Sequence, residues 1–211
     1  MTTTTVHTKR TRVGWGFWLQ WVGASTGGLT LAMLSLAVID SVAGQENSLG
    51  DGLAHIVGLA LAGAVVGIVQ WLVLRRQIRR AAWGVLANSV ALPVGFFGGY
   101  LLGGPPVDFF GGFVVLGILG GITYWLVLRQ QVYRAGWWVL ASSLGWVVGG
   151  GAAFVVAVTM GDAVGRSFAN ETLAFVAILS LLGVAGGLVG GAITGAALTR
   201  LLQHPLPGAR E

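Results

Sequence analysis

The sequence predicts an all-α fold, a polytopic membrane bundle of six transmembrane helices built as three repeated helical hairpins. Composition gives the first reason, since only 9% of the 211 residues are charged and 55% are hydrophobic, with a mean hydropathy of +0.82. Soluble domains carry about a quarter charged residues, so this chain has too few charges to cover a surface that faces water. Long apolar runs and an internal repeat are the second and third reasons.

Six apolar runs are long enough to cross a bilayer, which takes about 20 residues per helix. They cover about residues 14–39, 53–74, 81–103, 109–128, 135–160 and 173–199. The fourth is short, and Pro93 inside the third predicts a kink, because proline cannot donate the helix hydrogen bond. We therefore expect one membrane domain over 1–211, with short cytoplasmic tails at 1–11 and 203–211.

The first run has an alternative interpretation as a cleaved secretory signal. A basic segment precedes it, and Ser41-Val42-Ala43 resembles a cleavage site at its end. The run is longer than the apolar core of a signal peptide, which has about 7–15 residues. It also takes part in the internal repeat, so we favour a transmembrane helix.

The charged residues predict the orientation of the chain. All twelve basic residues except Arg166 fall at one end of a six-span arrangement, at Lys9, Arg10, Arg12, Arg75, Arg76, Arg79, Arg80, Arg129, Arg134, Arg200 and Arg210. All acidic residues except Glu211 fall at the other end, at Asp40, Glu46, Asp51, Asp108, Asp162 and Glu171. The positive-inside rule then places both termini in the cytoplasm.

The arginines of the two basic connections predict contacts with membrane lipids. They are Arg75, Arg76, Arg79, Arg80, Arg129 and Arg134, and tryptophans such as Trp71 and Trp125 lie beside them. Arginines next to a span attract anionic headgroups by about 1 kcal/mol each, and tryptophans anchor at the same level. A nucleic-acid partner is not expected, since these charges lie next to apolar spans.

An internal repeat divides the six runs into three hairpins. Residues 63–75 match residues 117–129 at an offset of 54, and the match continues to Trp83/Trp137. Weaker matches, at offsets of 122 and 70, relate the first run to the fifth and the fourth to the sixth. The predicted hairpins cover about 12–75, 80–129 and 134–200. They share one orientation, so their pseudo-symmetry axis lies along the membrane normal, unlike that of inverted-repeat transporters.

Two segments of the repeat carry a resemblance to known proteins. The QWLVLR segment at 70–75 and the WWVLASSLGW segment at 137–146 resemble uncharacterised multi-pass membrane proteins of bacteria such as cyanobacteria and green non-sulfur bacteria. The resemblance covers the repeat segments alone and implies no activity. It implies a location in the bacterial cell (inner) membrane.

Glycines at every fourth position predict close helix packing. The longest ladder is Gly183, Gly187, Gly191 and Gly195 on the last run. Residues four apart return to nearly the same face of a helix, so each ladder forms a flat groove for a neighbouring backbone. We favour packing within one chain, and the alternative is an interface in a homo-oligomer or with another membrane subunit.

Polar residues inside the runs are the candidate site. The repeat aligns Gln20, Asn88 and Ser142 on the odd runs and Gln70, Tyr124 and Thr194 on the even runs. The first interpretation is interhelical hydrogen bonding, worth about 0.6 kcal/mol per bond. The alternative is a small polar cavity that opens to the cytoplasm and holds a lipid headgroup, a ligand or a permeant solute.

Other motifs give little support for catalysis or metal binding. Gly23-Ala-Ser25-Thr-Gly27 matches G-x-S-x-G, but that motif needs a strand-to-helix turn and here lies in an apolar run. Asp51 and His55 are one turn apart at a helix start, where a structural pair is the simpler interpretation. The chain has no cysteine, and we expect no cofactor, no metal and no catalytic residue.

These observations predict a non-enzymatic membrane protein, and we expect a structural or accessory subunit of a membrane assembly. Its support is mainly the absence of an acid or base at mid-depth of the runs, where ion-coupled transporters usually carry one. The alternative is a small passive channel or transporter that uses the polar residues in the cytoplasmic half of the bundle.

Overall fold

The computed structural model describes residues 13–43, 49–78, 80–102 and 107–206, and these residues form six helices. The helices are α1 (Trp15–Ala43), α2 (Leu49–Leu74), α3 (Trp83–Leu102), α4 (Val107–Leu128), α5 (Trp137–Ser167) and α6 (Glu171–Leu202). The predicted all-α class with six apolar helices is confirmed. The structure extends most of the predicted runs by a few residues, and α5 by seven, at the end away from the arginines.

Five of the helices have the length and hydropathy to cross a membrane. The exception is α3, with 20 residues, in which Trp83–Gly99 is a shorter apolar helix that continues through Pro93. Twenty residues at 1.5 Å each extend about 30 Å, the thickness of the hydrocarbon layer. The chain is therefore a multi-pass membrane protein.

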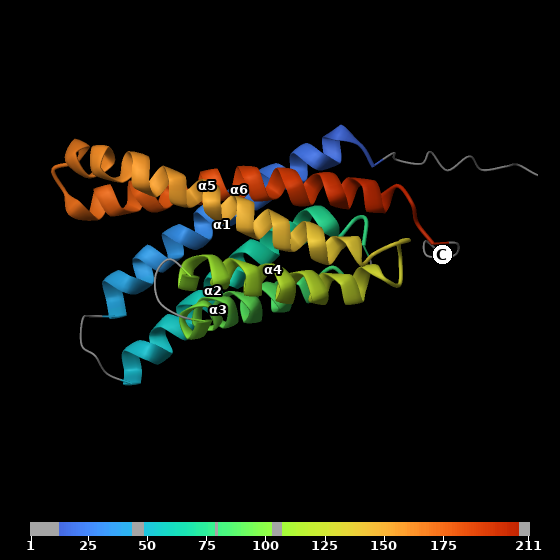
Figure 1. Cartoon of the computed structure of the whole chain (residues 1–211), viewed down its shortest axis with the longest axis horizontal. Coiled ribbons are helices and arrows are strands. Elements are labelled where there is room, and N and C mark those ends of the chain that lie inside the picture. The colour runs from blue at the N-terminus through green and yellow to red at the C-terminus, as the bar shows by residue number, and fades with distance from the viewer. Residues whose placement is uncertain (1–12, 44–48, 79, 103–106, 207–211) are drawn as a thin grey trace, which may run out of the picture.

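The six helices pack as a closed ring. Each helix contacts its neighbours in the chain, and α6 contacts α1, while within the described residues no packed pair crosses the ring. Figure 1 shows that the start of α1 and the end of α6 lie at one end of the molecule. The α5–α6 hairpin projects furthest at the opposite end. We call these the basic end, which carries Arg75, Arg129 and Arg200, and the opposite end.

The glycine ladder of α6 closes the ring against α1. A Cβ atom added to Gly183 would lie 2.5 Å from the Cα of Thr30, and one added to Gly187 would lie 2.5 Å from the Cα of Thr26. Side chains of α1 occupy the space beside Gly191 and Gly195 in the same way. The ladder is thus buried within the chain, and the Gly-faced side of α6 offers no surface to a partner.

The two connections between hairpins at the basic end, from α2 to α3 and from α4 to α5, share two features. Arg80 and Arg134 both adopt a left-handed backbone conformation, with φ of 63° and 55°. The guanidinium of Arg75 lies 5.4 Å from the ring centre of Trp71, and that of Arg129 lies 5.3 Å from the ring centre of Trp125. Such cation–π contacts hold each arginine at the level of the tryptophan belt.

The chain after α6 fastens the basic end. The amide of Gln203 donates to the carbonyl of Val13 at 3.0 Å, which joins the end of α6 to the start of α1. The backbone N–H of Leu206 donates to the carbonyl of Gln131 at 2.9 Å. Residues 203–206 of the predicted tail are therefore part of the fold, and residues 1–11 and 207–211 lie outside the described residues.

Candidate binding cavity

A cavity of about 190 Å³ lies inside the ring, and all six helices contribute to its lining. The contributing residues include Trp21 of α1, Val66 of α2, Asn88 of α3, Phe113 of α4, Trp138 of α5 and Thr194 of α6. For comparison, an engineered apolar cavity of about 150 Å³ binds benzene. The cavity is large enough for a molecule with a single six-membered ring.

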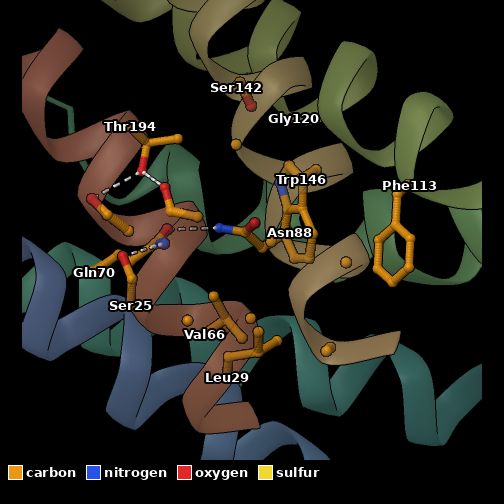
Figure 2. A pocket seen from close by; sticks show the side chains of 18 of the residues that line it. Ser25, Leu29, Val66, Gln70, Asn88, Phe113, Gly120, Ser142, Trp146 and Thr194 are labelled. Atoms are coloured by element: carbon orange, nitrogen blue, oxygen red, sulfur yellow. Dashed lines mark hydrogen bonds between the residues drawn. The ribbon is translucent and has the colours of Figure 1, made fainter. Parts of the chain in front are cut away.

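Gln70 is the centre of the polar end of the cavity (Figure 2). Its amide Nε2 donates to the hydroxyl of Ser25 at 3.5 Å, and its Oε1 accepts from the Nδ2 of Asn88 at 3.4 Å. The hydroxyl of Tyr124 also donates to Gln70 Oε1, at 3.4 Å. These bonds are long, so the network links four helices weakly.

A second polar contact lies between α1 and α6. The indole Nε1 of Trp21 donates to the hydroxyl of Thr194 at 3.0 Å, and that hydroxyl donates to the carbonyl of Gly190 at 2.8 Å. Trp18 anchors the same pair of helices, because its Nε1 donates to the carbonyl of Ala192 at 3.1 Å. The α1–α6 contact that closes the ring therefore has side-chain hydrogen bonds as well as glycine packing.

Five of the six predicted polar residues line this cavity, namely Asn88, Ser142, Gln70, Tyr124 and Thr194. The prediction for Gln20 was wrong, since its side chain is exposed on the outside of α1 and is absent from the lining. Ser25, which is buried and bonded to Gln70, takes the expected place.

Helix packing explains the misplacement of Gln20. Gly117 packs against Ser142 and Ser143, whereas its equivalent on α6, Gly187, packs against Ser25 and Thr26. Packing thus relates α5 to α1 at an offset of 117, five residues from the sequence match. The sequence match rested on a short Arg-x-Gly-Trp pattern at the helix start and on three glycine pairs, Gly23/Gly145, Gly27/Gly149 and Gly28/Gly150.

The other end of the cavity is apolar. Met33, Phe113, Ala153 and Leu182 line it. Phe113 stacks on Trp146 with ring centres 6.3 Å apart and an angle of 17° between planes. About three helical turns, roughly 16 Å, separate Phe113 from Tyr124 on α4. The cavity is therefore elongated, with a polar end toward the basic end of the ring and an apolar end away from it.

A layer of buried leucines lies between the polar end of the cavity and the basic end of the ring. Leu74, Leu128 and Leu198 follow Gln70, Tyr124 and Thr194 by one turn, and each is at most 1% exposed. They belong to one core cluster that also contains Trp21 and Trp138 and draws on α1, α2, α4, α5 and α6. This layer separates the cavity from the basic end.

Trp138 has a buried polar group without a partner. The side chain lines the cavity and is 3% exposed, and its Nε1 has no hydrogen-bond partner among the described residues. Tyr124 packs against it with ring centres 5.8 Å apart. A buried donor without an acceptor costs about 1–3 kcal/mol, so this N–H is a polar group to which a ligand can bond.

No charged residue is among the described residues that line the cavity. The described arginines of the basic connections are exposed, at Arg75, Arg76, Arg80, Arg129 and Arg134, and Arg79 lies outside the described residues. In the described part of the chain no group of three or more His, Asp or Glu residues is placed to hold a metal ion. The lining favours neutral molecules.

The ring and its cavity define a multi-pass membrane protein with an internal cavity of about 190 Å³. Comparison with protein-family models, with curated proteins and with solved structures finds no match.

Proposed function

We propose that this protein is a non-enzymatic integral membrane protein that binds a small neutral molecule of the lipid phase inside its helix ring. The elongated cavity, polar at one end and apolar at the other, is the observation that carries this proposal. Binding pockets are usually apolar with a few polar groups that fix the orientation of the ligand, and this lining has that composition.

The proposal treats the protein as a binding protein and not as a channel. The buried layer of Leu74, Leu128 and Leu198 lies across the path from the cavity to the basic end. A passive route for a solute would need a wet opening at this level. The described lining holds no charged residue, and its one titratable side chain is Tyr124, whose hydroxyl donates to Gln70. This supports a non-enzymatic role, because acid–base catalysis is most efficient with a group whose pKa lies near the operating pH.

The proposal includes a location and lipid contacts. We place the protein in a bacterial inner membrane with the basic end in the cytoplasm, since arginines gather at that end. Arg75 and Arg129, each held over a tryptophan, are positioned for the headgroups of anionic lipids. Arg76, Arg80 and Arg134 are exposed at the same level and extend this basic surface.

A role as a subunit of a membrane assembly is the second candidate. The observation that favours it is Gln20, an amide exposed on a membrane-spanning helix, where a polar group without a partner is unfavourable. Gly16 and Gly23 on the same face have nothing within 4 Å of an added Cβ atom, so a second helix can approach there. The partner would be a second copy of this chain or another membrane subunit.

Native mass spectrometry of the protein purified from its own membrane in mild detergent tests both candidates. Binding in the cavity predicts a monomer that carries one small molecule, and that molecule is lost in the Gly120→Leu variant. Gly120 is buried, lines the cavity and has nothing within 4 Å of an added Cβ atom, so a leucine fills the cavity without a backbone clash.

The matched control is Gly151→Leu, which also meets nothing within 4 Å but lies outside the lining. It should retain the bound molecule. An oligomer or a stoichiometric protein partner would support the subunit role, and a monomer without any bound molecule would count against both candidates.

A further inference from the structure

We infer that the cavity binds a molecule whose headgroup is one planar ring with hydrogen-bond-accepting oxygens, as in a quinone, and whose apolar tail extends toward the opposite end. This inference rests on the proposed function and names the chemical class of its ligand. The ring lies at the polar end beside Trp138 and Tyr124, and the tail lies along Phe113 and Leu182.

The lining of the cavity has no charged side chain among the described residues, which favours a neutral ligand. The described lining holds no arginine, lysine, histidine or carboxylate, so a phosphate, a carboxylate or an ammonium group would be buried without a counter-charge. Burial of an unpaired charge is far more costly than burial of a paired one. A phospholipid headgroup, a fatty-acid anion or a metal ion would therefore be an unfavourable occupant of the cavity.

The unpartnered donor of Trp138 favours a ligand with a hydrogen-bond acceptor. The unpartnered Nε1 of Trp138 is a donor only, because an indole has no acceptor, and it therefore selects an oxygen acceptor. The buried hydroxyl of Ser142, on the same helix one turn further along, also lines the cavity. A carbonyl oxygen on the ligand would satisfy the indole, whereas a pure hydrocarbon would leave it unpaired.

Shape favours a flat ring at this position. The volume of about 190 Å³ exceeds that of a cavity that binds benzene, so one ring and part of a chain fit. Glycines form much of the lining on α5 and α6, at Gly145, Gly149, Gly186 and Gly190. Faces without side chains, together with the rings of Trp138 and Tyr124, suit a planar group.

Binding of two probes to the purified protein tests the inference. The first probe is decyl-1,4-benzoquinone, and the second is decylbenzene, which has the same tail and ring size but no oxygen. We expect the quinone to bind in a 1:1 ratio with a dissociation constant about tenfold lower than that of decylbenzene, since one buried hydrogen bond contributes about that factor. This comparison needs no variant.

The Trp138→Phe variant removes the indole N–H and keeps an aromatic ring. It should weaken binding of the quinone about tenfold and leave binding of decylbenzene unchanged. Trp125→Phe is the control, because Trp125 lies outside the lining and contacts Arg129. It should leave both dissociation constants unchanged.

Three results would overturn the inference. They are equal affinity of the wild type for the two probes, unchanged quinone binding in Trp138→Phe, and binding of monodecanoylglycerol in place of the quinone. In the third case, the Gly120→Leu variant should no longer bind the glyceride. That result would support binding in the cavity, and it would show that the ligand is not quinone-like. If none of the probes binds and no small molecule is carried by the purified protein, the proposed function fails as well.

Discussion

Trp21 and Trp138 pack edge to face with ring centres 6.1 Å apart, but only the indole N–H of Trp21 has a partner within the chain. The packing offset of 117 makes the two residues equivalent members of the repeat. The third equivalent position is Gly84, where the hydroxyl of Tyr124 occupies the space of a side chain. Three equivalent positions thus hold a bonded indole, an unbonded indole and no side chain, so the described residues of the ring are not three-fold symmetric at this level.

The Gln70→Leu substitution should destabilise the protein by about 1–2 kcal/mol. Gln70 links Ser25, Asn88 and Tyr124 at 3.4–3.5 Å, and interhelical hydrogen bonds in membranes contribute about 0.6 kcal/mol each. The measurement is the free energy of unfolding in mixed dodecyl maltoside and SDS micelles.

Gln20→Leu is the matched control for that substitution. It replaces the same residue type on α1, but the side chain is exposed, so the free energy of unfolding should change by less than about 0.5 kcal/mol. If the two variants were equally destabilised, the assignment of Gln70 to the interior and of Gln20 to the outside would be wrong.

Gly187→Ala should lower the stability of the protein by about 1–3 kcal/mol, because the added methyl group would lie 2.5 Å from the Cα of Thr26 and force α1 and α6 apart. Gly23→Ala is the comparison, since an added Cβ atom there meets nothing within 4 Å. Thermal unfolding in detergent should show a lower midpoint for the first variant and an unchanged midpoint for the second. Equal midpoints would show that the ladder tolerates a side chain.

The sequence predicted the helices and most of the polar site because these depend on local patterns. Length and hydropathy determine a span, and the repeat at offset 54 aligned Asn88 with Ser142 and Gln70 with Tyr124, four residues that all line the cavity. The sequence did not predict that Ser25 replaces Gln20, because helix pairing across a ring depends on contacts far apart in the chain. It also did not predict the unpartnered N–H of Trp138, since the aromatic belt was a sufficient explanation for that tryptophan.

The leucine layer should make the ring impermeable to small solutes. Proteoliposomes that contain the wild-type protein should shrink in hyperosmotic glycerol and recover no faster than protein-free liposomes, because Leu74, Leu128 and Leu198 close the path. The double variant Leu74→Ala with Leu128→Ala removes side chains from this layer and should accelerate the recovery. Leu72→Ala with Leu126→Ala is the control, since both leucines are exposed on the outside. Rapid recovery with the wild type would revive the channel hypothesis.

Single cysteines introduced at the two ends should establish the orientation of the chain, because the natural sequence contains none. Gln130→Cys lies in the basic connection between α4 and α5, and Thr172→Cys lies at the start of α6 in the projecting hairpin, and both side chains are exposed. We expect a membrane-impermeant maleimide to label Thr172→Cys on intact cells and to label Gln130→Cys only after the membrane is permeabilised. The reason is that arginine-rich connections stay on the cytoplasmic side during insertion. The reverse labelling pattern would place the α5–α6 hairpin in the cytoplasm, and the polar end of the cavity would then face the outside of the cell.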